Sequence, residues 1–362
     1  MKRGVLALVS CFFSSIYADT SINSELRLRL GFESEGAKRD SLAIGAKAEL
    51  DLNLYKSIDA KLAFVTSQKL FNKDSANSIN FFSSQNSSYT IMQEAYLNYS
   101  LDDTNLKVGR VILDTPFADS DDIGMVANSF EAISLDRKLY KSLELDLLYI
   151  RSISGIDANK PQEFNKIDGG GLYATGFLYE YSDALSIDLW YYHFLSGSNY
   201  TYIDTNYGFD YHDISFELSL EYANESFKES SDSDIYGASF SSTLDRFTLF
   251  ISYDKSRSGV ADNGLGGGPF LSSMEFLTIA DGKEDADMIN TALSYDLDDM
   301  YQFFISLGRL SSGENENSKE LDLSFHYKYS KDLSYDLIYA NVDDTINSDR
   351  YKNLRFFINY NF

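Results

Sequence analysis

One run of strictly alternating side chains limits the folds that are open to this chain. From Leu42 to Leu54, every second residue is Leu, Ile or Ala, and the residues between them are small, polar or charged. Successive side chains of a strand point to opposite faces, so this run predicts a strand with one apolar and one polar face. It spans 13 residues, which exceeds the ~5–6 residues usual in soluble sheets and the ~9–11 that a tilted strand needs to cross a membrane.

The same alternation recurs to the very end of the chain, where Leu354, Phe356, Ile358, Tyr360 and Phe362 share one face. The pattern predicts 18 strands, at residues 25–31, 42–54, 60–69, 89–100, 106–112, 130–135, 143–151, 171–181, 185–194, 200–204, 216–225, 235–244, 246–255, 288–297, 301–310, 321–329, 333–342 and 354–362. An even number of strands brings both termini to one side, as in bacterial outer-membrane barrels, and roughly 16–18 strands fit the chain length.

The expected connections are sorted by length. Short ones fall at 57–58, 102–105, 136–141, 182–183, 245, 298–299 and 330–332, and long ones at 72–88, 114–127, 154–167 and 256–285. Short periplasmic turns and long extracellular loops are typical of outer-membrane barrels. We therefore predict an all-β, transmembrane antiparallel β-barrel of about 18 strands, formed by residues 19–362 as a single domain. The strand from 354 to 362 should pair with 25–31 to close it.

The first 18 residues have the features of a secretory signal peptide. Lys2 and Arg3 precede an apolar run from 5 to 17, and Ala18 offers a cleavage point. A lipoprotein cleavage box ending at Cys11 is a weaker alternative, because the apolar run continues past it. Cleavage after Ala18 would remove the single Cys, so no disulfide is expected in the mature chain. This segment predicts export to the bacterial outer membrane.

Composition excludes several other classes of protein. The mean hydropathy is −0.27 and the formal net charge is −24, so a polytopic helical membrane protein is excluded and nucleic acid is an improbable partner. The aromatic content, with 27 Tyr and 26 Phe, suits strands that show every second residue to lipid. A soluble all-β protein would share this composition, but it has no reason to sort its loops by length.

A barrel of this size encloses water, because side chains cannot fill the interior of roughly 16–18 strands. We expect the loop from 114 to 127 to fold inward as a constriction, since it combines Pro116 with small residues and four Asp. The pore-lining or constriction candidates are Arg27, Arg29, Lys47, Glu49, Lys107, Arg110, Asp114, Asp119, Asp121, Asp122 and Glu131.

Two arginines break the alternation. Arg110 shares its parity with Leu106 and Val108, and we expect a bulge at Gly109 to turn it into the lumen; a position at the rim is the alternative. Arg309 also breaks the alternation, and the sequence does not decide whether its side chain points into the lumen or lies at the rim. Acidic residues outnumber the bases predicted inside, which include Lys61 and Arg355. A mild preference for cations follows, and the two charge types could occupy opposite walls.

No catalytic motif is found. The glycines from 264 to 268 lack the Gly-Lys-Ser/Thr of a phosphate-binding loop and suggest a folded outer loop packed into the mouth. His193, His212 and His326 lie on separate strands without metal-binding spacing. We therefore expect no enzymatic activity, no cofactor and no metal site.

The run from 108 to 118, its continuation at 128–132, and the Gly-Gly-Pro-Phe…Ser-Met-Glu segment at 267–275 resemble the OprD-type specific porins of proteobacteria. The resemblance implies an 18-stranded passive channel for small polar solutes, often carboxylates or amino acids, with an inward third loop and a basic ladder. The bases predicted inside this chain are few and dispersed, which keeps general diffusion open.

The alternative function is a structural or adhesive barrel that binds through its extracellular loops. Expected partners are outer-membrane lipid, lipopolysaccharide, small polar solutes, and the barrel-assembly machinery, which would recognise the terminal Phe362. A monomer and a homotrimer both remain open.

Overall fold

The computed structural model describes residues 22–35, 39–73, 81–313, 316–346 and 349–362. The predicted signal peptide at 1–18 lies outside the described residues. No helix among the described residues is long and apolar enough to span a membrane.

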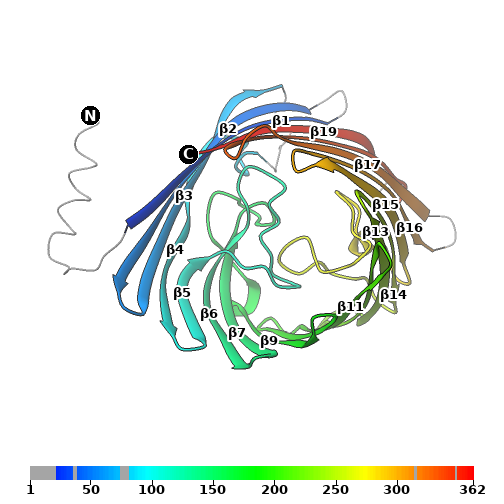
Figure 1. Ribbon diagram of the computed structural model, residues 1–362, viewed down its shortest axis with the longest axis horizontal. Coiled ribbons are helices and arrows are strands. Elements are labelled where there is room, and N and C mark those ends of the chain that lie inside the picture. The colour runs from blue at the N-terminus through cyan, green and yellow to red at the C-terminus, as the bar shows by residue number, and fades with distance from the viewer. Residues whose placement is uncertain (1–21, 36–38, 74–80, 314–315, 347–348) are drawn as a thin grey trace.

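A single antiparallel sheet curls into a closed barrel (Figure 1). Its strands are β1 (Ile22–Glu35), β2 (Arg39–Tyr55), β3 (Ile58–Asn72), β4 (Tyr89–Leu101), β5 (Thr104–Val111), β6 (Ser129–Tyr140), β7 (Leu143–Ser154), β8 (Asn165–Lys166), β9 (Leu172–Ser182), β10 (Leu185–Phe194), β11 (Asn199–Tyr211), β12 (Ile214–Ser226), β13 (Ser233–Leu244), β14 (Phe247–Arg257), β15 (Asp287–Asp298), β16 (Tyr301–Ser312), β17 (Glu316–Lys328), β18 (Leu333–Asp344) and β19 (Asp349–Asn361). The sheet has 19 strands, but β8 is a two-residue strand paired only with the end of β7. The wall therefore has 18 strands, as predicted.

The first and last long strands close the barrel. β1 and β19 pair from Arg27 opposite Asn361 to Glu35 opposite Asn353, and the Phe362 amide donates a hydrogen bond of 2.9 Å to the Leu26 carbonyl. Closure leaves no strand edge exposed for pairing with another chain. The predicted pairing of the C-terminal strand with the first one is confirmed.

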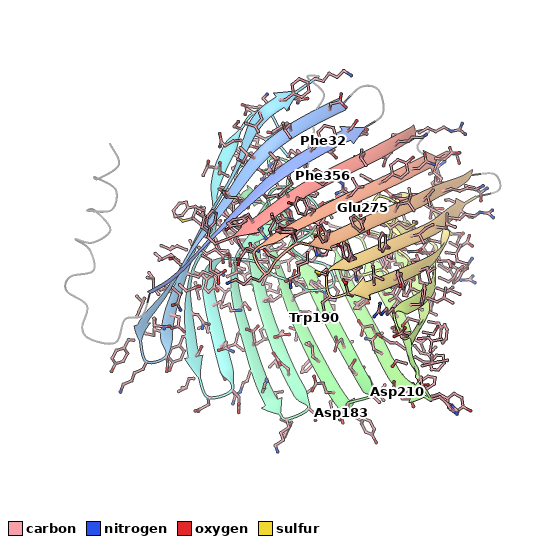
Figure 2. All side chains as sticks on the ribbon, turned by 45° about the horizontal axis from the view of Figure 1, so that its top comes forward. Phe32, Asp183, Trp190, Asp210, Glu275 and Phe356 are labelled. Carbon is pink, nitrogen blue, oxygen red and sulfur yellow. The ribbon has the colours of Figure 1, made fainter. Side chains whose placement is uncertain are left out.

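The two faces of the wall differ as the alternation predicts. Leu293, Ile305 and Leu323 lie side by side on the outer face, and each is at least 40% exposed. Phe32 and Phe356 face each other on neighbouring strands of that surface (Figure 2). On the inner face of β16 and β17, Ser306 and Asp322 are buried. Apolar side chains thus point to lipid and polar ones into the barrel.

One end of the barrel carries only short turns, where Asp183 and Asp210 lie (Figure 2). The long loops at 73–88, 112–128, 155–171 and 258–286 all leave the other end, although that end also has short connections such as 195–198. β11 runs to Tyr211, well past the predicted end at 204. In its second half, polar residues point inward and Tyr207, Phe209 and Tyr211 point outward. Because the inner positions are polar, the sequence prediction ended this strand too early.

Candidate functional site

Two long loops enter the barrel from its loop end and fill much of its interior (Figure 1). One joins β5 to β6 at 112–128, and the other joins β14 to β15 at 258–286. We call them the first and second inner loops. The first is the loop that the sequence predicted to fold inward.

The two inner loops join through their backbones. The Leu265 amide donates to the Phe117 carbonyl over 2.9 Å, and the Asp119 amide donates to the Leu265 carbonyl over 3.3 Å. Asp119 Oδ1 in turn accepts from the Gly267 amide at 3.3 Å. Gly264 has a φ of +71°, and a Cβ there would lie 2.7 Å from the Phe117 carbonyl oxygen. The glycines thus permit a close approach of two backbones.

An aromatic cluster fixes the first inner loop to one wall. Phe117 is fully buried and makes edge-on contacts with Tyr192, Tyr200, Tyr202 and Phe270, with ring centroids 5.0 to 6.2 Å apart. The three tyrosines come from β10 and β11. Aromatic pairs in this arrangement contribute about 0.5–1.5 kcal/mol each beyond their buried area, so Phe117 is a strong anchor.

Arg29 of β1 holds the tip of the same loop from the opposite wall. Its guanidinium donates to the Gly124 carbonyl at 2.5 Å and lies 3.4 Å from an Asp122 carboxylate oxygen. It also donates to Asn359 Oδ1 at 2.7 Å and stacks over the Phe357 ring, 4.8 Å from its centroid. The Arg29 side chain is thereby only 15% exposed.

Arg355 of β19 supplies a second grip on the loops. It donates to the Ile123 carbonyl at 2.9 Å and forms an ion pair with Glu275 of the second inner loop. Its guanidinium also lies over the Phe276 ring, 5.4 Å from the centroid. The Arg355 side chain is 0% exposed. Its charge therefore interacts with the loops and is not accessible to a solute.

Two further bases of this wall, Lys47 and Lys61, are paired with acids. Lys47 forms ion pairs with Glu49 and, at 3.6 Å, with Glu94. Lys61 lies 3.6 Å from Glu49 and 3.7 Å from Glu94. All four side chains point inward from β2, β3 and β4, and none is more than 23% exposed. This network neutralises itself.

Acidic residues dominate the other wall. The described strands β9 to β13 contain no Lys or Arg. Their inward acidic residues include Asp188, Asp204, Glu217, Glu221 and Glu225. Among the described side chains, the inward arginines all lie near the junction of β1 and β19, so the inner face is divided into a basic and an acidic side.

Carboxylates of β12, β14 and β17 also hold the second inner loop. Asp254 Oδ2 accepts from the Ser272 amide at 2.7 Å, and Glu320 Oε2 accepts from the Leu277 amide at 2.7 Å. Glu221 accepts from the Leu271 amide at 3.2 Å. Each of the three carboxyl groups thus accepts a hydrogen bond from a different backbone amide of the second inner loop, so this loop is fastened at several points along its length.

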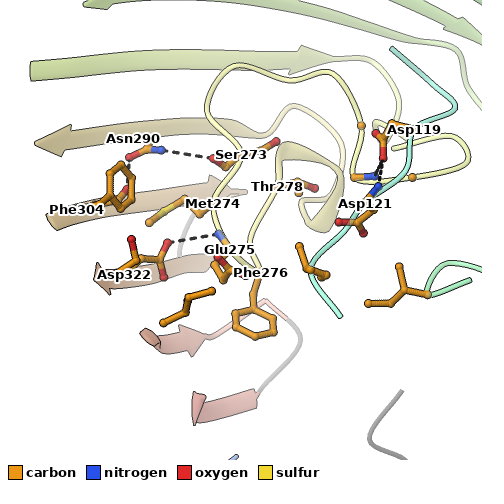
Figure 3. A pocket seen from close by; sticks show the side chains of 18 of the residues that line it. Asp119, Asp121, Ser273, Met274, Glu275, Phe276, Thr278, Asn290, Phe304 and Asp322 are labelled. Atoms are coloured by element: carbon orange, nitrogen blue, oxygen red, sulfur yellow. Dashed lines mark hydrogen bonds between the residues drawn. The ribbon is translucent and has the colours of Figure 1, made fainter. Parts of the chain in front are cut away.

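Between the inner loops and strands β15 to β18 lies a cavity of about 930 Å³ (Figure 3). Its lining includes Glu275, Phe276, Asn290, Phe304, Asp322 and His326. Asp322 Oδ2 accepts from the Glu275 amide at 3.3 Å, while its other oxygen is buried without a hydrogen-bond partner among the described residues. The cavity combines acidic groups with two aromatic faces.

Two aspartates at the junction of the inner loops border this cavity. Burial, followed by repulsion from Asp157, raises the pKa of Asp121 to about 7. Burial also raises the pKa of Asp119, against the hydrogen bonds from Gly267 and Asp121. Asp121 therefore changes its charge near neutral pH.

A family model named OprD, described as outer membrane porin, OprD family, matches residues 83–262, about half of the chain. This match spans the first inner loop and the strands that hold Phe117. The chain belongs to the OprD family of outer membrane porins. As such it is a passive outer-membrane channel for small solutes and not an enzyme, and nothing found supports the adhesive alternative.

Solved structures of porins share the whole fold. OpdK of Pseudomonas aeruginosa has a TM-score of 0.81 at 15% identity, covering 94% of this chain and 98% of that one. OccD3 (OpdP) of the same species has a TM-score of 0.80 at 15% identity, covering 96% and 92%. OccAB4 of Acinetobacter baumannii has a TM-score of 0.81 at 15% identity, covering 94% and 98%. No curated protein matches the sequence.

The porin brings most of the sequence candidates to its interior. Asp114, Asp119, Asp121 and Asp122 lie on the first inner loop, and Arg29 contacts that loop. Lys107 shares the inward parity of Gly109 and lies opposite Ser134, which is buried. Arg27, Lys47 and Glu49 surround a smaller hollow near Phe362, at the turn end. As determinants of permeation, all of these stay predictions.

Arg110 and Glu131 lie apart from the cavity. Their charged groups are 3.5 Å apart, and the Arg110 guanidinium stacks over Phe164, 4.3 Å from the ring centroid. They share a depression with Val108 and Ile133, which point outward. Arg309 also points outward, where it bonds to Asn317 at the rim.

The sequence did not single out Glu275 or Phe117. Glu275 lay in a segment recognised by its glycines, and its partner Arg355 is 80 residues away. Phe117 looked like one more loop residue, because its contacts on β10 and β11 are distant in sequence. Within the described ranges, no group of three or more His, Cys, Asp or Glu residues is placed to hold a metal ion.

Proposed function

We propose that this porin passes small cationic or neutral polar solutes in preference to anions. The supporting observation is the bonding of the two inward arginines that contact the inner loops. Arg355 is hidden beneath Glu275 and Ile123, and Arg29 is bonded to Gly124 and Asp122. An anion entering the constriction would compete with these internal bonds, whereas a cation meets the exposed Glu217 and the half-buried Asp188 and Asp204 of the opposite wall.

The same proposal assigns the constriction to the two inner loops. Three acids of these loops border the cavity that lies against strands β15 to β18: Asp119 and Asp121 of the first inner loop, and Glu275 of the second. Low-dielectric walls lined by one sign of charge raise the local concentration of the opposite ion. Because Glu275 is paired with Arg355, Asp119 and Asp121 are the proposed determinants of selectivity.

The test is the reversal potential of the purified barrel in a planar bilayer under a salt gradient. We expect a sign that reports cation preference, and anion selectivity would refute the proposal. Liposome swelling with a cationic amino acid, a neutral sugar and vanillate then ranks the solutes. Vanillate belongs in the series because OpdK was solved with it, and fastest entry of vanillate would favour a carboxylate channel.

We also propose three contacts of the porin outside its lumen. Lipopolysaccharide would surround its loop end, and the barrel-assembly machinery would recognise Phe362, which is 67% exposed at the end of β19. The homotrimer considered from the sequence belongs to the same proposal. The mass of the assembly extracted in mild detergent separates it from a monomer.

A further inference from the structure

A cluster of bases lies on the outer surface of the barrel near its loop end. Register places Arg309 of β16 directly beside Lys319 of β17, Lys319 beside Asp343 of β18, and Asp343 beside Arg350 of β19. Lys352 lies one row closer to the barrel centre, beside Asn341. We call Arg309, Lys319, Arg350 and Lys352 the rim patch.

These side chains point outward and are exposed. Arg309 has the parity of Ile305 and Leu307, which are 40% and 57% exposed, and Lys319 has the parity of Leu323. All four bases of the rim patch are themselves exposed. The rim patch therefore belongs to the surface that faces lipid, and it lies outside the lumen.

The rim patch is not neutralised by the protein. Register places one acid, Asp343, directly between Lys319 and Arg350, and it pairs with Arg350 at 2.6 Å. Arg309 donates to the neutral Asn317, and neither Lys319 nor Lys352 has an ion pair with a described residue. Like charges directly opposite on neighbouring strands lie ~4.5–5.5 Å apart and destabilise a sheet. Arg309 and Lys319 thus form an arrangement that a bound anion would stabilise.

Position decides which anion fits. The next outward-facing row contains Leu307 and Leu321, and the row beyond it contains Ile305, Leu323 and Leu354. Rows of one face are two residues apart, about 7 Å along a strand. The rim patch therefore borders the apolar band on the side of the extracellular loops, at the height where lipid headgroups begin.

The concentration of bases is local. The protein carries a net charge of −24, and strands β9 to β13 on the far side of the barrel contain no Lys or Arg. A general attraction of the protein for anions is thus excluded. The complementary group is a phosphate that stays beside an apolar wall, as in a phosphorylated lipid.

We propose that the rim patch binds the phosphate groups of lipopolysaccharide in the outer leaflet. Arg309 offers planar, paired donors that suit a phosphate, and Lys319 and Lys352 add point charges. This inference rests on the proposed contact with lipopolysaccharide and names the site of that contact. It is independent of which solute the channel passes.

The experiment compares binding of diphosphoryl lipid A to the folded wild-type barrel, R309Q/K319Q and R137Q/K138Q in native mass spectrometry. The second variant also removes two charges, but at the turn end of β6. We expect R309Q/K319Q to weaken binding at least tenfold and R137Q/K138Q to leave it within twofold. Heat-modifiable gel migration confirms that each variant is folded, and monophosphoryl lipid A should bind more weakly to the wild type.

Equal binding by wild type and R309Q/K319Q would overturn the site while leaving the proposed lipopolysaccharide contact intact. A wild type that binds no lipid A would overturn both. Displacement of lipid A by an equal concentration of inorganic phosphate would show a free-ion site and would also overturn the assignment to a lipid.

Discussion

Arg29 and Arg355 show how far a single residue can be understood from sequence. Alternation placed both side chains on the inner face, and the structure agrees. What they bind was not predictable, because Arg355 donates to the Ile123 carbonyl from 232 residues away. Strand periodicity is a local property, whereas a partner across the lumen depends on the closed ring. Two presumed solute-facing bases are therefore clamps on the inner loops.

Replacement of Arg355 by Gln should loosen the constriction. The change leaves Glu275 without its cation, and breaking a buried ion pair costs ~3–5 kcal/mol. We expect larger single-channel conductance with more current noise in planar bilayers. R27Q is the matched control, because Arg27 also points inward but lies near Phe362 at the turn end. Unchanged conductance in R355Q would contradict the clamp.

Selectivity should depend on pH through Asp121. The pKa of Asp121 is raised to about 7 by burial and by Asp157, so this carboxyl is charged above that pH and neutral below it. Lowering the pH from about 8 to about 6 crosses this value and removes a negative charge, which should reduce cation preference. Reversal potentials at both pH values measure the effect, and it should shrink in D121N. An equal pH response in D121N would assign it to another group.

At the scale of the elements, the strands were predictable and the joining of the loops was not. All 18 long strands were expected from alternation, because each must place one face in lipid. The inward course of the first inner loop followed from Pro116 and its small residues. The pairing of Phe117 with Leu265 could not be read, because it joins segments 148 residues apart and has no periodic signature.

Gly264→Ala tests that junction. Gly264 has a φ of +71° and a new Cβ would meet the Phe117 carbonyl, so the change combines backbone strain of ~1–2 kcal/mol with a steric conflict. We expect increased conductance and a lower midpoint for thermal unfolding by gel migration. Gly313→Ala is the control, because its φ is +68° with nothing within 4 Å of a new Cβ. If the two changes had equal effects, backbone strain alone would explain them, and the contact between Gly264 and Phe117 would not be supported.

At the scale of the whole molecule, the order of the strands around the barrel determines how charge is distributed over the inner face, which no single strand shows. Charge counts indicated an acidic lumen, but the sequence could not say where each charge lies on the circumference. Pairing of β1 with β19 places both clamping arginines on neighbouring strands, opposite the acidic strands β9 to β13. The divided interior is thus a consequence of closure.

Deletion of Phe362 should impair assembly more than function. In the folded barrel, its backbone contributes one hydrogen bond to Leu26 and its ring contacts Tyr360, and a single hydrogen bond contributes only about 0.5–1.5 kcal/mol. We expect fewer barrels in the outer membrane with normal single-channel conductance in those that form. Heat-modifiable migration of membrane fractions gives the yield, and Phe362→Tyr should retain it. Normal yield after deletion would remove Phe362 from the assembly signal.

The seam between β1 and β19 has a consequence for the order of events during biogenesis. Arg29 stands on one side of this seam and Arg355 on the other, and both hold the tip of the first inner loop. Before the first and last strands pair, the contacts of Arg29 and Arg355 with the loop tip cannot both be in place. Both grips on the loop tip are therefore in place together only when the wall is complete.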